Sequence, residues 1–281
     1  MVKVLNPGLY SSIQDFGRVG FQQYGVPIAG VMDQYSAALA NHILGNHETA
    51  AVIEMTMTGA TLQFYNDTYI CVTGADMSPK LNDVLLQLNK AIKIQTGDVL
   101  SFGKIKTGFR TYVSVLGGFK SEMVMNSQSM FGGITSELKL VINDEFKYDV
   151  SNSFIERKNA SIKVNNNMFL KHDIEAFQGP EYHLLSQKQQ DILLNSPFSI
   201  SNNNNRMAYQ LQEPLENSLE PIITSGVLPG TVQLTPSGKL IILMRDCQTT
   251  GGYPRVLQLK ESAINILAQK YTGQQIRFKL V

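Results

Sequence analysis

Short segments of apolar, β-branched and aromatic residues recur along most of the chain, and turn residues bound nearly all of them. This pattern is typical of short strands joined by tight turns. The strands predicted in the first half cover residues 52–56, 61–65, 68–72, 84–88 and 110–116. Strands at this spacing favour barrels or sandwiches over a doubly wound sheet. The sequence therefore predicts a mainly β protein.

Helical spacing of apolar residues is confined to three places. For the first helix, Asp33 is a suitable N-cap and Gly45 a suitable C-terminal stop. Tyr35, Leu39 and Ile43 recur every four residues between them. Two further helices are expected over residues 186–194 and 263–271. We expect these few short helices to plug or flank barrels.

A polar stretch in the middle of the chain divides it into two mainly β halves. Its few hydrophobic residues could not form a core of their own. The predicted N-terminal domain is 1–150, the linker is 151–167 and the C-terminal domain is 168–281. The boundary is soft, because the first 60 residues could pack against either half.

Composition narrows the kind of partner. The 281 residues include 24 Lys and Arg against 23 Asp and Glu, so the net charge of +1 predicts no electrostatic attraction to nucleic acid or membranes. A small molecule or a neutral partner is expected instead. No leader precedes the two distant cysteines, Cys71 and Cys247, and no apolar stretch reaches about 18 residues. We expect a cytoplasmic protein with free thiols.

Several familiar chemistries are excluded by spacing. Gly238-Lys239 resembles the end of a phosphate loop, but Gln233 replaces the glycine five positions earlier and Leu240 follows the lysine. No Gly-x-Gly-x-x-Gly occurs, and the four histidines lack zinc-ligand spacing, so no metal is expected. The asparagine run 202–205 is interpreted as biased composition or a loop tip.

Residues 246–254 follow the apolar run 240–244 and concentrate several kinds of reactive group. The segment supplies a carboxylate, hydrogen-bonding side chains, two glycines whose amides can approach a ligand closely, and a stiff end. These residues are Asp246, Gln248, Thr249, Thr250, Gly251, Gly252, Tyr253 and Pro254. The alternative interpretation is a simple glycine turn between strands. Cys247 is a poor nucleophile, because the neighbouring carboxylate raises its pKa.

Further polar motifs lie elsewhere, in a fixed order along the chain. They cover residues 8–18, 25–33 and 40–46, then Glu54 in a strand, then 205–209 and 225–233 before the 246–254 segment. In this order the chain resembles the family that includes the C subunit of 5-oxoprolinase, KipA, allophanate hydrolase subunit 2 and the carboxyltransferase domain of urea carboxylase. The resemblance implies two linked cyclophilin-like β-barrel domains.

The chain departs from the family pattern at several arginines. Cys247 stands where the family commonly has Arg, and Gln128 stands within Ser127-Gln128-Ser129 in place of Ser-Arg-Ser. The usual Gly-Arg is also replaced around Ser136-Glu137. An arginine is a planar, permanently charged donor that Gln or Cys cannot replace. Either the ligand differs or those arginines were structural.

The resemblance implies a subunit of a complex that opens 5-oxoproline to glutamate at the expense of ATP. Its expected partners in that complex are a KipI-like subunit and a LamB/YcsF-like subunit. One alternative is a non-catalytic KipA-like regulator that binds a KipI-like partner. Another is a carboxyltransferase that acts with a separate biotin carrier, because this chain has no Met-Lys-Met acceptor for covalent biotin.

Roles for the oxoprolinase reaction follow from side-chain chemistry. Asp246 could act as a general base or orient an amide, and Arg206 could bind a carboxylate or phosphoryl oxygen. Thr249, Thr250 and the glycine amides could stabilise an oxyanion, and Tyr253 could donate a hydrogen bond. Further candidate binding residues are Asn205, Gln248, Asp15, Arg18 and Asp33. Each of these residues also has a structural alternative. Arg206 could pair with a core acid, Asp246 could cap a turn and Asp33 could cap a helix.

Overall fold

The computed structural model describes residues 1–149 and 169–281, which form two compact units. The first unit contains Met1–Gly17 and the described part of Asp33–Asn166; the second contains Arg18–Met32 and the described part of Asn167–Val281. The sequence-based division placed residues 18–32 in the first domain, whereas the structure groups them with the second. The predicted linker 151–167 lies outside the described residues.

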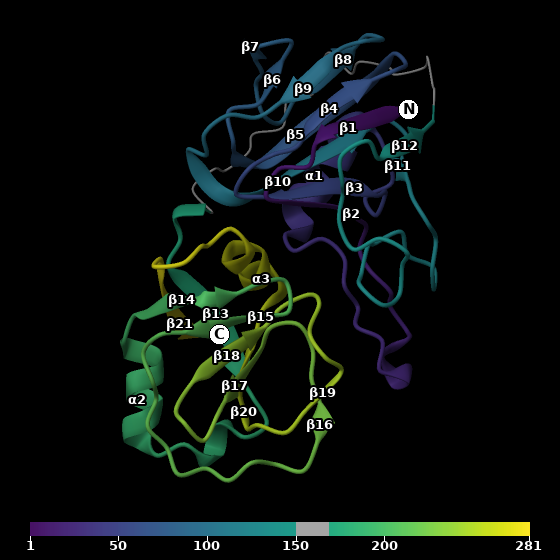
Figure 1. Cartoon of the computed structure of the whole chain (residues 1–281). Coiled ribbons are helices and arrows are strands. Elements are labelled where there is room, and N and C mark those ends of the chain that lie inside the picture. Colours follow the sequence, from purple (N-terminus) through teal and green to yellow (C-terminus); the bar gives the residue numbers. More distant parts are fainter. Residues whose placement is uncertain (150–168) are drawn as a thin grey trace. The chain divides into compact units, whose positions relative to one another are not determined.

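The first unit is built from two sheets (Figure 1). The seven-stranded sheet has the order β11 (Phe119–Lys120), β12 (Glu145–Tyr148), β1 (Val2–Asn6), β4 (Thr61–Phe64), β9 (Val99–Ser101), β6 (Lys80–Leu81) and β7 (Val84–Leu85). The five-stranded sheet has the order β2 (Tyr10–Gln14), β3 (Val52–Thr56), β10 (Thr107–Val115), β5 (Thr68–Asp76) and β8 (Ala91–Ile94). The strands of both sheets pair antiparallel throughout the described residues.

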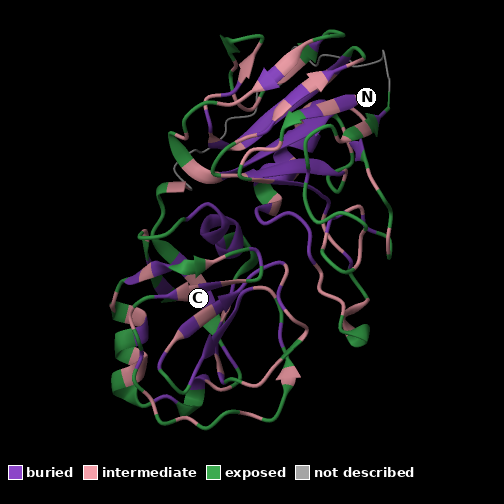
Figure 2. Cartoon of the chain, viewed as in Figure 1, coloured by how far each residue is buried: buried purple, intermediate pink, exposed green. Residues whose placement is uncertain are grey.

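Alternating apolar residues direct the core of the first unit. In β4, Leu62 and Phe64 are buried, whereas Thr61 and Gln63 are only partly covered. This period of two places one face of the strand in the core, which appears as purple segments in Figure 2. The helix α1 (Gln34–Leu44) packs on β5 and β10.

The second unit contains a closed barrel, seen in the lower part of Figure 1. Its strand order is β13 (Asp173–Gln178), β20 (Arg255–Leu259), β17 (Thr231–Leu234), β18 (Leu240–Leu243), β15 (Ala208–Leu211), β14 (Phe198–Asn204) and β21 (Gln275–Leu280). The parallel pairing of β13 with β21 closes it. A two-stranded sheet, β16 (Ser225–Gly226) with β19 (Thr250–Gly251), belongs to the same unit.

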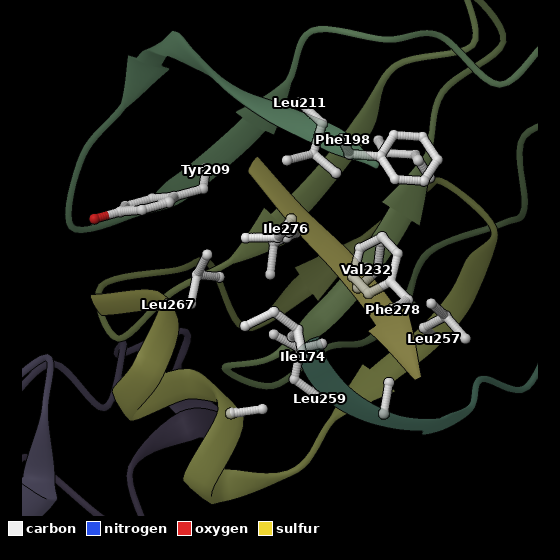
Figure 3. Close-up of a cluster of buried hydrophobic side chains, with 14 of the residues drawn as sticks. Ile174, Phe198, Tyr209, Leu211, Val232, Leu257, Leu259, Leu267, Ile276 and Phe278 are labelled. Carbon is white, nitrogen blue, oxygen red and sulfur yellow. The ribbon is translucent and has the colours of Figure 1, made fainter. Parts of the chain in front are cut away.

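Aliphatic and aromatic side chains fill the barrel (Figure 3). Phe198 and Phe278 stack at a tilted angle with ring centroids 5.8 Å apart. The helix α3 (Glu261–Ala268) adds Leu267 to the same core and packs on β13. The helix α2 (Gln187–Asn195) begins with a capping box at Ser186 and packs on β21. Short 3₁₀ helices, η1 (Gln22–Tyr24) and η3 (Tyr182–Leu184), complete the unit.

The predicted fold class is confirmed, since the described residues are mainly β with three short α-helices. The strand predicted at 52–56 coincides with β3, whereas in 84–88 only Val84–Leu85 pair as β7. The third helix ends at Ala268, earlier than the predicted 271. The barrel closes in the second unit, while the first unit distributes its strands over two sheets. No helix among the described residues is long and apolar enough to span a membrane.

Candidate functional site

Arg206 and Asp246 form a close bidentate pair in the second unit. The Arg206 Nε donates to Asp246 Oδ2 at 2.8 Å, and Nη2 donates to Oδ1 at 2.9 Å. Both side chains are largely buried, with 8% and 13% of their surface exposed. Parallel hydrogen bonds of this kind fix the guanidinium plane as well as its position. Two of the predicted site residues, Arg206 and Asp246, are therefore in direct contact.

The backbone around the pair is tied together locally. Asp246 follows β18, and its amide donates to the Arg206 carbonyl at 3.0 Å. Asn205 precedes the arginine in the turn between β14 and β15, and its side-chain oxygen accepts the amides of Met207 and Ala208 at 2.8 and 3.1 Å. Asn205 thus shapes the turn that presents Arg206.

The segment 28–30 packs against this pair within the same unit. Arg206 Nη2 donates to the Gly30 carbonyl at 2.6 Å, and the Ala29 amide donates to the Arg245 carbonyl at 2.9 Å. Ala29 and Gly30 have φ values of 57° and 88°. An alanine in the left-handed region costs about 1 kcal/mol, so the surrounding contacts must hold it there. The guanidinium of Arg206 therefore both pairs with Asp246 and anchors this turn.

The side chains of the 247–253 loop differ in their surroundings. Burial raises the pKa of the Cys247 thiol to about 12, and the neighbouring Asp246 carboxylate adds to that rise. A thiol held in this state is a poor nucleophile at neutral pH. Hydrogen-bonding groups without a side-chain hydrogen bond to any described residue are those of Gln248, Thr249, Thr250 and Tyr253. These groups can bind a substrate without breaking internal bonds.

The two glycines of the loop, Gly251 and Gly252, differ in the space that surrounds them. A Cβ on Gly251 would collide with the side-chain nitrogen of Gln233, whereas a Cβ on Gly252 would meet the Ile222 carbonyl at an ordinary 3.4 Å. Gly251 also belongs to β19, where it pairs with Ser225. A side chain at position 251 would therefore require the buried Gln233 side chain to move, whereas one at position 252 would make an ordinary van der Waals contact.

Asp15 lies in the first unit, in a cradle of neutral donors. Its Oδ1 accepts from Ser127 Oγ at 2.6 Å, Ser129 Oγ at 2.7 Å and the Gly17 amide at 2.8 Å. Its Oδ2 accepts from the Gln128 amide at 2.7 Å. The serines of Ser127-Gln128-Ser129 therefore bind Asp15, and the geometry gives this carboxylate a positioning role.

Asp33 caps α1, as the structural alternative predicted. Its carboxylate accepts from the Ser36 amide at 3.0 Å and from Ser36 Oγ at 2.6 Å. Its own amide donates to the Tyr112 hydroxyl at 2.8 Å. Burial raises the pKa of Tyr112 well above its usual value, and the nearby Glu54 and Asp33 charges raise it further.

Glu54 and Arg110 form a buried ion pair in the first unit that the sequence-based candidates omitted. Their Oε1 and Nε atoms are 3.9 Å apart, and the side chains are 1% and 2% exposed. Burying two charges is costly unless they are well paired. The sequence signal for this pair was a glutamate between the apolar residues of a predicted strand.

Arg18, another predicted site residue, belongs to the second unit and is fully buried. Its amide donates to the Ile28 carbonyl at 2.7 Å.

Comparison with known proteins identifies the family. The family model for the carboxyltransferase domain, subdomain A and B, matches residues 24–280. The chain belongs to this family. It is 32% identical to the C subunit of 5-oxoprolinase from Escherichia coli (strain K12), over 99% of this chain and 90% of that protein.

Two further relatives show how widely this carboxyltransferase-domain fold occurs. The C subunit of 5-oxoprolinase from Haemophilus influenzae is 31% identical, over the whole chain and 91% of that protein. The crystal structure of the K. lactis urea amidolyase matches with a TM-score of 0.88 and 27% identity, over 99% of this chain and 18% of that one. The family resemblance inferred from the motifs is confirmed.

Proposed function

We propose that this protein is a subunit of an ATP-dependent 5-oxoprolinase that opens 5-oxoproline to glutamate. The observation that carries the proposal is the similarity to two proteins named as C subunits of 5-oxoprolinase, over nearly their full length. The expected partners are a LamB/YcsF-like subunit and a KipI-like subunit, and the expected location is the cytoplasm. ATP is a substrate of the complex.

The reaction adds one water across the lactam C–N bond, and ATP hydrolysis drives it. A lactam is a resonance-stabilised amide, so its carbonyl needs activation before water can attack. We assign Arg206 to an oxyanion of the substrate or phosphoryl group, because its guanidinium plane is fixed by Asp246. Asp246, with both oxygens facing a cation, is then an orienting group in preference to a general base.

The loop after Asp246 supplies the remaining polar contacts. Tyr253 is 40% exposed, and its hydroxyl can donate to a substrate carbonyl. Thr249 and Thr250 offer hydroxyls in the same loop. Donors that converge on a developing negative charge stabilise it in the transition state.

A reconstitution assay tests the proposal. The purified chain, mixed with its two partner subunits, should release glutamate from 5-oxoproline only when ATP is present. Tyr253→Phe removes one hydroxyl without breaking a side-chain hydrogen bond to the described residues, so the fold should survive while kcat falls about tenfold. Ile223→Ala, at a side chain that is 94% exposed, is the control and should leave the rate unchanged. An unchanged rate in the Tyr253 variant would remove that residue from the site.

Carboxyl transfer is the second candidate, favoured by the carboxyltransferase family to which the chain belongs. The biotin of that reaction would be carried by a separate protein. Transfer of labelled carboxyl from a carboxylated carrier to an acceptor, without glutamate release from 5-oxoproline, would select this function. Tight binding to the KipI-like subunit with neither activity would select the regulatory alternative.

A further inference from the structure

An open groove of about 500 Å³ lies on the outside of the second unit. Amide side chains form much of its lining, together with one lysine and one threonine. These residues are Asn202, Asn203, Gln210, Gln212, Lys239 and Thr272. No described acidic residue lines the groove, and its lining is separate from the Arg206–Asp246 pair and from residues 246–254. The asparagine run, interpreted from the sequence as biased composition or a loop tip, lies in β14 and the turn after it.

A β-bulge opens this surface. Between β14 and β15, Ile200 pairs with Leu211 and Asn204 pairs with Tyr209, so residues 201–203 face a single residue, Gln210. The Ser201 carbonyl, inside the bulge, accepts from Asn204 Nδ2 at 2.6 Å and from Thr272 Oγ1 at 3.3 Å. β-bulges change the direction of side chains and are over-represented next to active sites.

Hydrogen bonds within the bulge orient the amides. Asn203 Nδ2 donates to Gln210 Oε1 at 3.3 Å, which leaves the Gln210 NH₂ group as a donor. Gln212 Nε2 donates to the Ile200 carbonyl at 3.4 Å. The Asn202 side-chain amide forms no hydrogen bond with the described residues. The groove therefore keeps amide donors that the fold does not use.

Lys239 contributes the single charge among the described lining residues. The preceding turn fixes its backbone, because the Lys239 amide donates to Thr235 Oγ1 at 3.0 Å and Gly238 adopts a φ of 81°. Its side chain is half-buried, and its ammonium has no carboxylate partner among the described residues. An ammonium group beside neutral hydrogen-bond donors attracts an anion.

We propose that this groove is a binding site for a small molecule with an oxyanion group, a carboxylate or a phosphate. Lys239 supplies the charge, while Asn202 and Gln210 supply neutral donors. The volume lies within the range of small-molecule pockets. Because the described lining lacks carboxylates, no like charge there repels an anion. The site is independent of the proposed oxoprolinase activity.

Calorimetric titration of the whole chain at low ionic strength tests the site, with inorganic phosphate and glutamate as separate probes. At least one probe should bind with a millimolar dissociation constant. Lys239→Gln should weaken binding about tenfold or more, since it removes a charge-assisted hydrogen bond. Lys188→Gln makes the same charge change on the exposed face of α2 and should leave the affinity unchanged.

Asn202→Asp sharpens the test, because it places a carboxylate in the groove at an exposed position. Binding of either probe should be abolished. Selective binding of phosphate or of glutamate would support the site and identify which oxyanion it prefers. The proposal is overturned if neither probe binds with a dissociation constant below about 50 mM. It is also overturned if Lys188→Gln weakens binding as much as Lys239→Gln.

Discussion

Two largely buried aspartates hold polar segments of this protein in different ways. Asp246 in the second unit faces the permanent charge of Arg206 through two hydrogen bonds of 2.8 and 2.9 Å. Asp15 in the first unit accepts from hydroxyl and amide groups, four of them between 2.6 and 2.8 Å. One carboxylate is neutralised by an ion pair and the other is solvated by the fold.

The difference predicts how each site fails. When one member of a buried ion pair is lost, the other charge stays behind in a poor solvent. When a carboxylate is lost from a cradle of neutral donors, several weaker hydrogen bonds are broken at once. Loss of an ion-pair partner therefore lowers the stability of the fold by one large electrostatic penalty. Loss of the carboxylate from the neutral donors lowers it by the sum of several smaller penalties.

Asp246→Ala should have the largest effect, because it leaves the guanidinium of Arg206 buried without its counter-ion. We expect the free energy of unfolding to fall by about 3–5 kcal/mol, as measured by urea denaturation. The double variant Arg206→Met/Asp246→Ala should recover part of this loss. Equal stability of Asp246→Ala and the wild type would show that the pair is solvated despite its low exposure.

Asp15→Asn should have a smaller effect. One oxygen of the new amide can still accept, but its NH₂ group faces donors such as the Gln128 amide and the serine hydroxyls. The expected loss is about 1–3 kcal/mol in the same assay. Asp83→Asn, at an exposed turn position whose φ of 64° suits asparagine, is a matched control that should change little. A loss as large as that of Asp246→Ala would mean that the cradle depends on charge after all.

Gly251→Ala tests whether packing, in addition to charge, shapes the loop after Asp246. The added methyl group would meet the buried Gln233 side chain, and overpacking should cost about 1–2 kcal/mol. Gly252→Ala should be tolerated better, and Gln233→Ala should relieve the clash in a double-mutant cycle. Identical thermal melting of the two glycine variants would contradict this difference.

Glu181→Gln examines a bidentate pair with more solvent around it. Glu181 accepts from Arg255 Nε and Nη2 at 2.9 and 2.8 Å, and these hydrogen bonds lower its pKa. The lowered pKa stabilises the fold above the unfolded glutamate pKa of about 4.3, and this contribution is lost as the pH falls through the folded pKa. The free energy of unfolding of the wild type should exceed that of the variant by about 1 kcal/mol at pH 7. The two values should become equal in acid. A difference that does not change with pH would exclude a charge effect.

Local patterns predicted the elements better than they predicted the site. The cap at Asp33, the stop at Gly45 and the helix start at Ser186 depend on a few neighbouring residues, so the sequence reveals them. The Arg206–Asp246 contact joins residues 40 positions apart, which only the barrel brings together. The sequence offered an Arg206 pair with a core acid as one alternative, but it did not identify Asp246 as that acid.

Other features depend on tertiary structure alone. The excursion of Arg18–Met32 into the second unit has no signal in composition, because those residues look like an ordinary loop. The approach of Glu54 to Arg110 follows from the pairing of β3 with β10, which sets Glu54 opposite Tyr112, two residues along the strand from Arg110. The groove beside Lys239 depends on a bulge whose register no short-range pattern specifies.

The route of the chain has a consequence for how the protein can be divided. The core of the second unit includes Met32, and Arg206 donates to the Gly30 carbonyl, so the barrel takes part of its interior from residues far upstream in the sequence. A fragment that begins after residue 168 would lack both Met32 and Gly30. Such a fragment should need a peptide spanning residues 18–32, supplied in trans, to reach its native stability.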